Sequence, residues 1–101
     1  VRQIRSLSVE LRWTRTALEN LQAIATYIAR DNPDRAHSLI GEIKDKTEVL
    51  AQFPAIGRPG RVPGTRELVV HENYLVPYRV KEGVAQILRL HHVARCWPRH
   101  F

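Results

Sequence analysis

The stretch DNPD at residues 31–34 constrains the fold of this chain more than any other feature, because it separates two segments with helical periodicity. Apolar residues recur at helical spacing over residues 18–28 and again over residues 36–51. Asn32 is a favourable N-cap, and Pro33 suits the first position of a helix. Because so few residues join the two helices, the sequence predicts an antiparallel helix hairpin.

The ends of this hairpin carry residues with capping and helix-breaking properties. Thr14 and Thr16 are both candidate N-caps for the first helix, and Thr16 with Glu19 has the spacing of a capping box. Pro54 ends the second helix. Basic and acidic residues are balanced on both helices, which does not favour a helix that reads DNA.

Four segments have the composition of β-strands, namely residues 7–13, 65–71, 73–81 and 84–92. A loop rich in proline and glycine, residues 54–64, follows the helices, and Glu82-Gly83 forms a tight turn between the last two strands. The order β-α-α-β-β-β predicts an α+β fold with the helix hairpin on one face of a mainly antiparallel sheet. We expect one domain, residues 1–101, with flexible ends at 1–6 and 99–101.

The other face of this sheet has little sequence left to cover it, so it is the expected place for a functional site. Alternation along the middle strand puts Arg79 on this open face. In the last strand it puts Ile87, Arg89 and His91 on the open face, and Leu88, Leu90 and His92 on the helix side. Pro77 cannot donate a hydrogen bond to a neighbouring strand, so it predicts an edge or a bulge, and a bulge would change this alternation.

The net charge of +6 is concentrated in one half of the chain. Residues 58–101 contain eight Lys and Arg against three Asp and Glu, which favours an anionic partner such as RNA, DNA or an acidic protein segment. A basic surface that only keeps the protein soluble is the alternative. No apolar run approaches the roughly 20 residues that span a bilayer. With one cysteine and no recognisable export signal, we expect a cytoplasmic protein without membrane association.

The C-terminal stretch LRLHHVARCWPRHF raises the question of a metal site. His92, Cys96 and His100 are spaced by four, but Pro98 interrupts the helix that would align them, and there is no second pair of ligands. We therefore predict no metal and no cofactor.

General acid–base cleavage of RNA is a sharper hypothesis for the basic half. It requires a group that titrates near neutrality and cations that stabilise the charged transition state. These groups are available from His91, His92, Arg66, Arg89 and Arg95. Glu67 would act as a base or hold an arginine. In the structural alternative Glu67 pairs with a neighbouring arginine, the histidines cap the strand end, and Trp97 and Phe101 pack rather than stack on bases.

Several stretches together resemble a known group of proteins. The segments WTRTALENLQAIATYIARDNP, LAQFPAIGRPGRVPGTRELVV, YLVPYRV and ILRLHHVARCWP are similar, in order and spacing, to the RelE/ParE superfamily of bacterial toxins. These are the toxin halves of type II toxin–antitoxin modules. The resemblance covers about residues 9–98 and implies the same fold, two helices against an antiparallel sheet.

The superfamily combines two activities. RelE-like and YoeB-like members cleave mRNA on the ribosome, whereas ParE-like members poison DNA gyrase, and the GRPGR-x-PGTRELVV block looks more ParE-like. For the ribonuclease branch, His92 falls at the terminal catalytic histidine of YoeB-like enzymes and Arg66 near one of their arginines. Leu75 replaces an arginine expected early in the middle strand, and Lys81 is the only lysine near the open face.

The resemblance implies a growth-inhibiting toxin that acts on DNA gyrase, serves plasmid stabilisation and is neutralised by a cognate antitoxin. We expect the antitoxin to bind through an acidic segment that folds on binding, and operator DNA to be contacted only through the antitoxin. Residues expected to contact the target or the antitoxin are Arg58, Arg61, Arg79, Trp97 and Phe101. The alternatives are ribosome-dependent mRNA cleavage, with His92, Arg95, Arg66, Arg89 and His91 as the catalytic set, and a basic binding module without toxicity.

Overall fold

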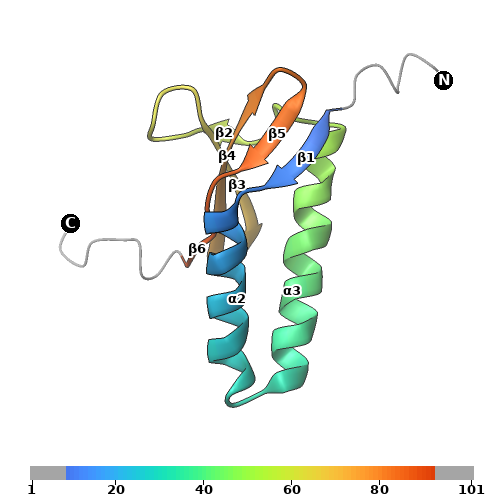
Figure 1. Ribbon diagram of the computed structural model, residues 1–101, viewed down its shortest axis with the longest axis vertical. Helices are drawn as coiled ribbons and strands as arrows, with labels where there is room; N and C mark the ends of the chain where they lie inside the picture. Colours follow the sequence, from blue (N-terminus) through green and yellow to red (C-terminus); the bar gives the residue numbers. More distant parts are fainter. Residues whose placement is uncertain (1–8, 93–101) are drawn as a thin grey trace.

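The computed structural model describes residues 9–92 and has an α+β architecture (Figure 1). The helices are α2 (Arg15–Ala29) and α3 (Pro33–Glu48), and a 3₁₀ turn, η1 (Val49–Ala51), follows α3. The strands are β1 (Glu10–Trp13), β2 (Arg58–Pro59), β3 (Arg66–His71), β4 (Tyr74–Lys81), β5 (Val84–Ile87) and β6 (His91–His92). Within the described range, no helix is long and apolar enough to cross a membrane.

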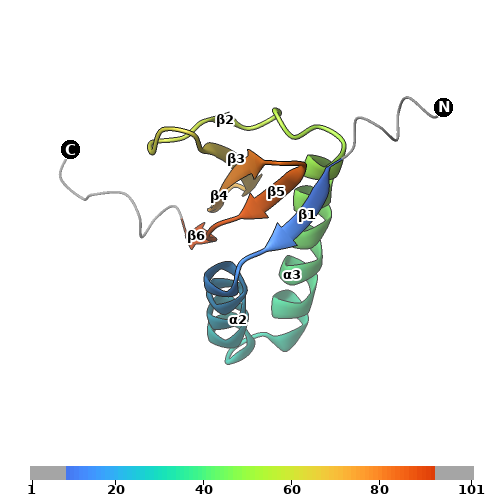
Figure 2. The ribbon, with the colours of Figure 1, turned by 45° about the horizontal axis from the view of Figure 1, so that its top comes forward.

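The strands form one sheet in the order β1-β5-β4-β3-β2, and β6 also pairs with β4. The pairs are antiparallel except that β1 runs parallel to β5. Both helices lie on the same side of the sheet and extend beyond it as a hairpin (Figures 1 and 2). The α+β fold predicted from the sequence is therefore confirmed. One element was not predicted, since the loop 54–64 contains the short strand β2.

The caps of the two helices are formed by residues named from the sequence. Asn32 accepts a hydrogen bond from the backbone N–H of Arg35 at 3.0 Å, as expected for an N-cap. For α2 the cap is Thr14, whose hydroxyl accepts from the backbone N–H of Ala17 at 3.2 Å and donates to the carbonyl of Ile87 at 2.8 Å. Thr16 lies inside the first turn, so the capping box was wrong. Thr14 is the cap because its hydroxyl also ties the start of α2 to β5.

A bulge interrupts the pairing of the last strand opposite Pro77. Tyr78 pairs with Ile87, whereas Leu75 pairs with His91, so the three residues 88–90 face only two residues of β4. The backbone N–H of Leu88 donates to the carbonyl of Pro77 at 2.9 Å. Pro77 was expected to mark an edge or a bulge, and a bulge does lie opposite it, although in the partner strand rather than in β4. The single strand expected over residues 84–92 is divided into β5 and β6.

This bulge corrects the predicted faces of two residues. Ile87 was expected on the open face, but it is fully buried in the core between the sheet and the helices. Leu88 was expected on the helix side, but it lines a pocket on the open face. Because of the inserted residue, Ile87 and His91 lie on opposite faces of the sheet. Leu90 points into the core, as predicted.

The turn between β4 and β5 matches its prediction. Glu82 and Gly83 both have positive φ, 53° and 79°, which is the backbone combination that a two-residue hairpin turn of the primed type requires. Glycine adopts this conformation at little cost, so Gly83 suits the second position.

The two candidate caps of α2 can be separated by mutation. Thr14→Ala removes both the acceptor for Ala17 and the donor to Ile87, so we expect the free energy of unfolding to fall by about 1–2 kcal/mol. Thr16→Ala is the matched control, because Thr16 is exposed within the helix and alanine has the higher helix propensity. Chemical denaturation measures both effects, and equal losses in the two variants would contradict the assignment of Thr14.

Candidate functional site

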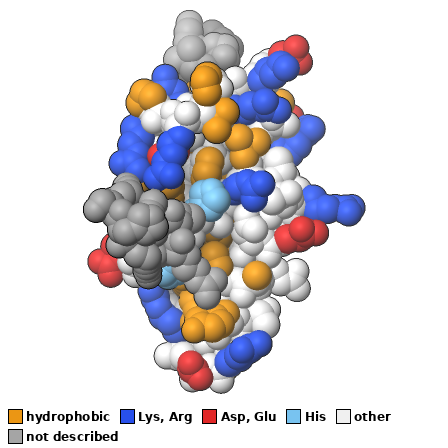
Figure 3. Space-filling model, turned by 90° about the vertical axis from the view of Figure 1, so that its left-hand side faces the viewer, with side chains coloured by type: hydrophobic (Ala, Val, Ile, Leu, Met, Phe, Trp, Pro, Cys, Tyr) orange, Lys and Arg blue, Asp and Glu red, His pale blue; other side chains and the backbone are white. Residues whose placement is uncertain are grey.

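The open face of the sheet contains a pocket with a volume of about 500 Å³. Its lining combines apolar and basic side chains from the β2–β3 loop, from β3 and β4, and from the segment after β5: Arg61, Val62, Thr65, Glu67, Leu75, Pro77, Arg79, Leu88, Arg89 and His91. We call the pocket with the lining given above the open-face pocket. We call the loop 54–64 the β2 loop, because it contains β2. On the side of the molecule where the β2 loop and β6 lie, basic side chains gather around a strip of apolar ones, and a histidine lies beside this strip (Figure 3).

Two kinds of side chain make up the open-face pocket. Leu75 and Pro77 of β4 are joined by Leu88, which follows the buried Ile87 on the opposite face, and these three residues form an apolar floor. Arg79 and Arg89 are exposed arginines at its rim. The Nε of Arg79 donates to the side-chain oxygen of Gln86 at 3.0 Å, so its bonding partner is uncharged.

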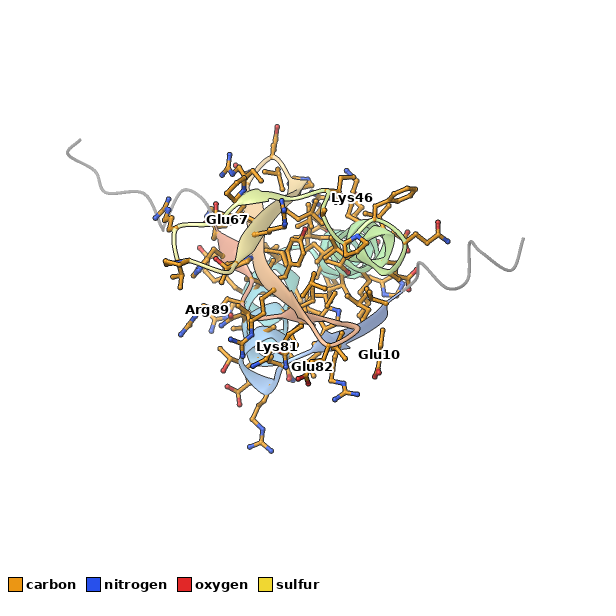
Figure 4. The ribbon with its side chains drawn as sticks, turned by 90° about the horizontal axis from the view of Figure 1, so that it is seen from above. Glu10, Lys46, Glu67, Lys81, Glu82 and Arg89 are labelled. Carbon is orange, nitrogen blue, oxygen red and sulfur yellow. The ribbon has the colours of Figure 1, made fainter. Side chains whose placement is uncertain are left out.

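Glu67 is the carboxylate of this pocket, and it is 9% exposed. Its Oε1 accepts from Nε of Arg58 at 3.4 Å, and its Oε2 accepts from the backbone N–H of Arg61 at 3.4 Å. Glu67 and Arg89 approach the same side of the sheet from different segments (Figure 4). The structure thus corresponds to the alternative in which Glu67 pairs with a neighbouring arginine. Glu67 also anchors the β2 loop through the backbone N–H of Arg61.

His91 is the titratable side chain of the pocket with a perturbed pKa. Partial burial lowers the pKa of its imidazole below the ordinary 6.5, and the positive charges of Arg89 and Arg61 lower it further. The negative charge of Glu67 opposes this effect without reversing it. The imidazole is therefore neutral at pH 7 and able to accept a proton.

His92 lies on the opposite face from His91, as alternation along the strand predicted. Its ring packs against Tyr74 in an edge-on arrangement with 4.9 Å between ring centroids. It lines a second pocket, between the sheet and α2, together with Ile24, Tyr27 and Ile28. The structure therefore does not bring His92 together with His91 and Arg89.

Arg66 is also directed away from the open-face pocket. One of its terminal nitrogens, Nη1, donates to the carbonyl of Gly57 at 2.7 Å and to the carbonyl of Ala55 at 3.3 Å. The hydroxyl of Tyr78 bonds to the same loop, since it donates to the carbonyl of Pro54 at 2.7 Å and accepts from the N–H of Gly57 at 2.9 Å. These contacts hold the loop that precedes β2.

The site contains residues that the sequence did not single out. Leu88 was missed because its side depends on the bulge, and the only signal for that bulge was Pro77. Tyr78 is a core residue of β4, and nothing in the sequence indicated that its hydroxyl would bond to the loop 54–64.

Several predicted residues lie outside the described part of the chain, namely Arg95, Cys96, Trp97, Pro98, His100 and Phe101. Among residues 9–92, no group of three or more His, Cys, Asp or Glu side chains could hold a metal ion. Of the members of the proposed ribonuclease set within residues 9–92, those that line the open-face pocket are His91 and Arg89.

Two helices against a mainly antiparallel sheet are the architecture implied by the superfamily resemblance, and the comparisons specify the family. The family model described as the ParE toxin of the type II toxin–antitoxin system parDE matches residues 11–97. The chain therefore belongs to the ParE family of type II toxin–antitoxin toxins.

Relatives of known sequence and structure agree with this assignment. The chain is 42% identical to "Putative toxin Y4kP" of Sinorhizobium fredii over 90 residues, covering 88% of this chain and 93% of the relative. It is 37% identical to the toxin RelE2 of Caulobacter vibrioides over 83 residues, covering 82% and 93% of the two chains. It also resembles a chain of the chromosomal ParDE system of P. aeruginosa, with a TM-score of 0.79, 33% identity and coverage of 85% and 97%.

A more distant structure supports the fold alone. The RelBE2 toxin–antitoxin complex of Mycobacterium tuberculosis contains a chain that superposes with a TM-score of 0.63 at 23% identity, covering 84% of this chain and 98% of that one. The fold is therefore shared with proteins crystallised as toxin–antitoxin complexes.

The electrostatic influence of Arg89 on His91 can be measured directly. We expect Arg89→Gln to raise the pKa of His91 toward its ordinary value, because a nearby positive charge disfavours the imidazolium ion. Arg79→Gln removes the same charge from another point of the rim, and Arg79 is not among the groups that shift this pKa. NMR titration of the His91 ring measures both variants, and an equal rise in the two would contradict the assignment.

The same pKa predicts how stability depends on pH. Because the folded protein has a lower His91 pKa than the unfolded chain, the unfolded chain binds the proton more readily as the pH falls below 6.5. The free energy that neutral His91 contributes to stability is therefore fully present above pH 6.5. It is lost as the pH falls through the pKa of His91 in the folded protein. We expect the free energy of unfolding of His91→Gln to depend less on pH between 7.5 and 5 than that of the wild type, and an unchanged slope would contradict this.

Proposed function

We propose that this ParE-family toxin arrests growth by acting on DNA gyrase. The observation that carries the proposal is the separation of the residues that a superfamily ribonuclease would use. His92 packs against Tyr74 on the helix side, and Arg66 donates to carbonyls of the loop before β2. General acid–base cleavage requires its groups within hydrogen-bonding reach of one substrate, which this arrangement does not favour.

The gyrase proposal requires a binding surface rather than a catalytic set. Arg58 and Arg61 come from the β2 loop and Arg79 from β4, and this basic surface suits an interaction in which charge guides the encounter. These arginines remain our proposed contacts for the target or the antitoxin, together with Trp97 and Phe101 of the C-terminal end.

Cleavage of mRNA on the ribosome is the second candidate, and one observation favours it. His91 is neutral at pH 7 and shares the open-face pocket with Arg89, so a proton acceptor lies beside a cation that can stabilise a phosphate transition state. In this alternative His91, rather than His92, is the general base.

The proposed partner is a cognate antitoxin with an acidic segment that folds as it binds. The excess of basic residues in the second half of the chain supports this choice. A neighbouring reading frame that encodes a small protein with a DNA-binding N-terminal part and an acidic tail would be its source. Contact with operator DNA would then come through the antitoxin.

Induction of the chain in bacterial cells separates the two targets. We expect growth arrest with an SOS response, filamentation and intact mRNA. In a separate assay in vitro, we expect the purified protein to inhibit supercoiling by purified gyrase. His91→Asn and His92→Asn should retain this toxicity, because neither histidine is among the proposed contacts for the target. Primer extension on total RNA from the same cultures tests the alternative.

Codon-linked mRNA cleavage that falls at least about 100-fold in His91→Asn would contradict the gyrase proposal and establish the ribonuclease. Soluble expression without growth arrest, SOS response or cleavage would contradict both and favour a basic binding module.

A further inference from the structure

The segment after β5 places an apolar side chain on the open face of the sheet. Leu88 follows the buried Ile87 on the opposite face, where it lines the open-face pocket beside Leu75 and Pro77. An aliphatic floor in a solvent-open pocket favours a ligand that can cover it, because burial of apolar surface stabilises the bound state.

The rim of the pocket carries positive charge without matching carboxylates. Within residues 9–92, no carboxylate forms an ion pair with Arg79 or Arg89. Glu67 is the acidic residue of the lining, and its ion pair is with Arg58. A ligand that brings carboxylates to Arg79 and Arg89 would form the charge-assisted hydrogen bonds that guanidinium groups favour.

The character of the lining distinguishes a peptide from a nucleic acid. Bases of single-stranded nucleic acids stack on the rings of Tyr, Trp, Phe and His and on arginine guanidinium planes. In the described part of the chain the open-face pocket has no Tyr, Trp or Phe in its lining, and its groups that could stack are His91 and the arginines. Leu75, Pro77 and Leu88 instead offer a surface suited to one aliphatic side chain.

We propose that the open-face pocket is the anchor site for an acidic peptide segment in which carboxylates flank one aliphatic side chain. The aliphatic side chain packs on Leu88 and Pro77, and the carboxylates bind Arg79 and Arg89. The inference rests on the proposed neutralisation by an antitoxin and names the residues of the antitoxin segment by their chemistry. It assigns Leu88 a role in recognition that the fold alone does not require.

Fluorescence anisotropy with the full-length chain and a labelled peptide containing the core Glu-Glu-Leu-Glu-Glu tests the proposal. We expect Arg89→Gln and Leu88→Ser each to weaken binding about tenfold, through a lost charge-assisted hydrogen bond and a lost apolar contact respectively. Lys81→Gln is the matched control for Arg89→Gln. It removes one positive charge from an exposed position on β4 outside the lining, so its effect should stay below about twofold.

Two altered peptides separate the two parts of the recognition. Replacing the leucine by serine should weaken binding about as much as Leu88→Ser does, and replacing every glutamate by glutamine should abolish it. Circular dichroism and thermal unfolding of Leu88→Ser establish that it is folded, and Arg89→Gln provides an independent variant at an exposed residue.

Several results would overturn the proposal. Equal losses in Lys81→Gln and Arg89→Gln would indicate diffuse charge attraction, and equal binding of the serine peptide would remove the apolar anchor. Tighter binding of a single-stranded RNA oligonucleotide, weakened by Arg89→Gln, would assign the pocket to RNA. Supercoiling by gyrase is assayed separately, so the two proposals can fail independently. Peptide binding without gyrase inhibition would refute only the proposal that gyrase is the target. Gyrase inhibition without peptide binding would refute only the proposed anchor site.

Discussion

The hydroxyl of Tyr78 makes the pair of hydrogen bonds on which the open-face pocket depends. This side chain is fully buried in β4, yet its oxygen donates to the carbonyl of Pro54 and accepts from the N–H of Gly57. A Cβ atom at residue 57 would lie 2.7 Å from the Tyr78 ring, so only glycine permits this approach. With Arg66 holding two carbonyls of the same loop, β2 is fixed beside β3, and Arg58 and Arg61 are brought to Glu67.

The fold could be predicted from local signals because each element carries its own. The turn at Asn32-Pro33, the periodicity of α2 and α3, and the turn at Glu82-Gly83 all depend on neighbouring residues, and the structure agrees with them. The choice between Thr14 and Thr16 could not be made locally, because the carbonyl of Ile87 decides it from the far end of the chain. The strand β2 was missed for a related reason, since it exists only through its pairing with β3.

The site was predicted in part, for reasons that the bulge makes clear. Alternation correctly separated His91 from His92, because both follow the inserted residue. It failed for Ile87 and Leu88, where the strand changes register, and Pro77 indicated only that a change would occur nearby. Arg66 was a candidate for the catalytic set by its charge and by the resemblance. Its bonds to loop carbonyls depend on a conformation that no local pattern in residues 54–64 reveals.

The parallel pairing of β1 with β5 also has a consequence for the timing of folding. Glu10 pairs with Val84 and Trp13 with Ile87, so the first described strand finds its neighbour in the sheet more than 70 residues later. The helix hairpin can form from local contacts, but the edge of the sheet closes only after residue 87 has been synthesised and has left the ribosome. The open face is thus completed late, and a growing chain cannot present the finished pocket before its last lining residue, His91, has left the ribosome.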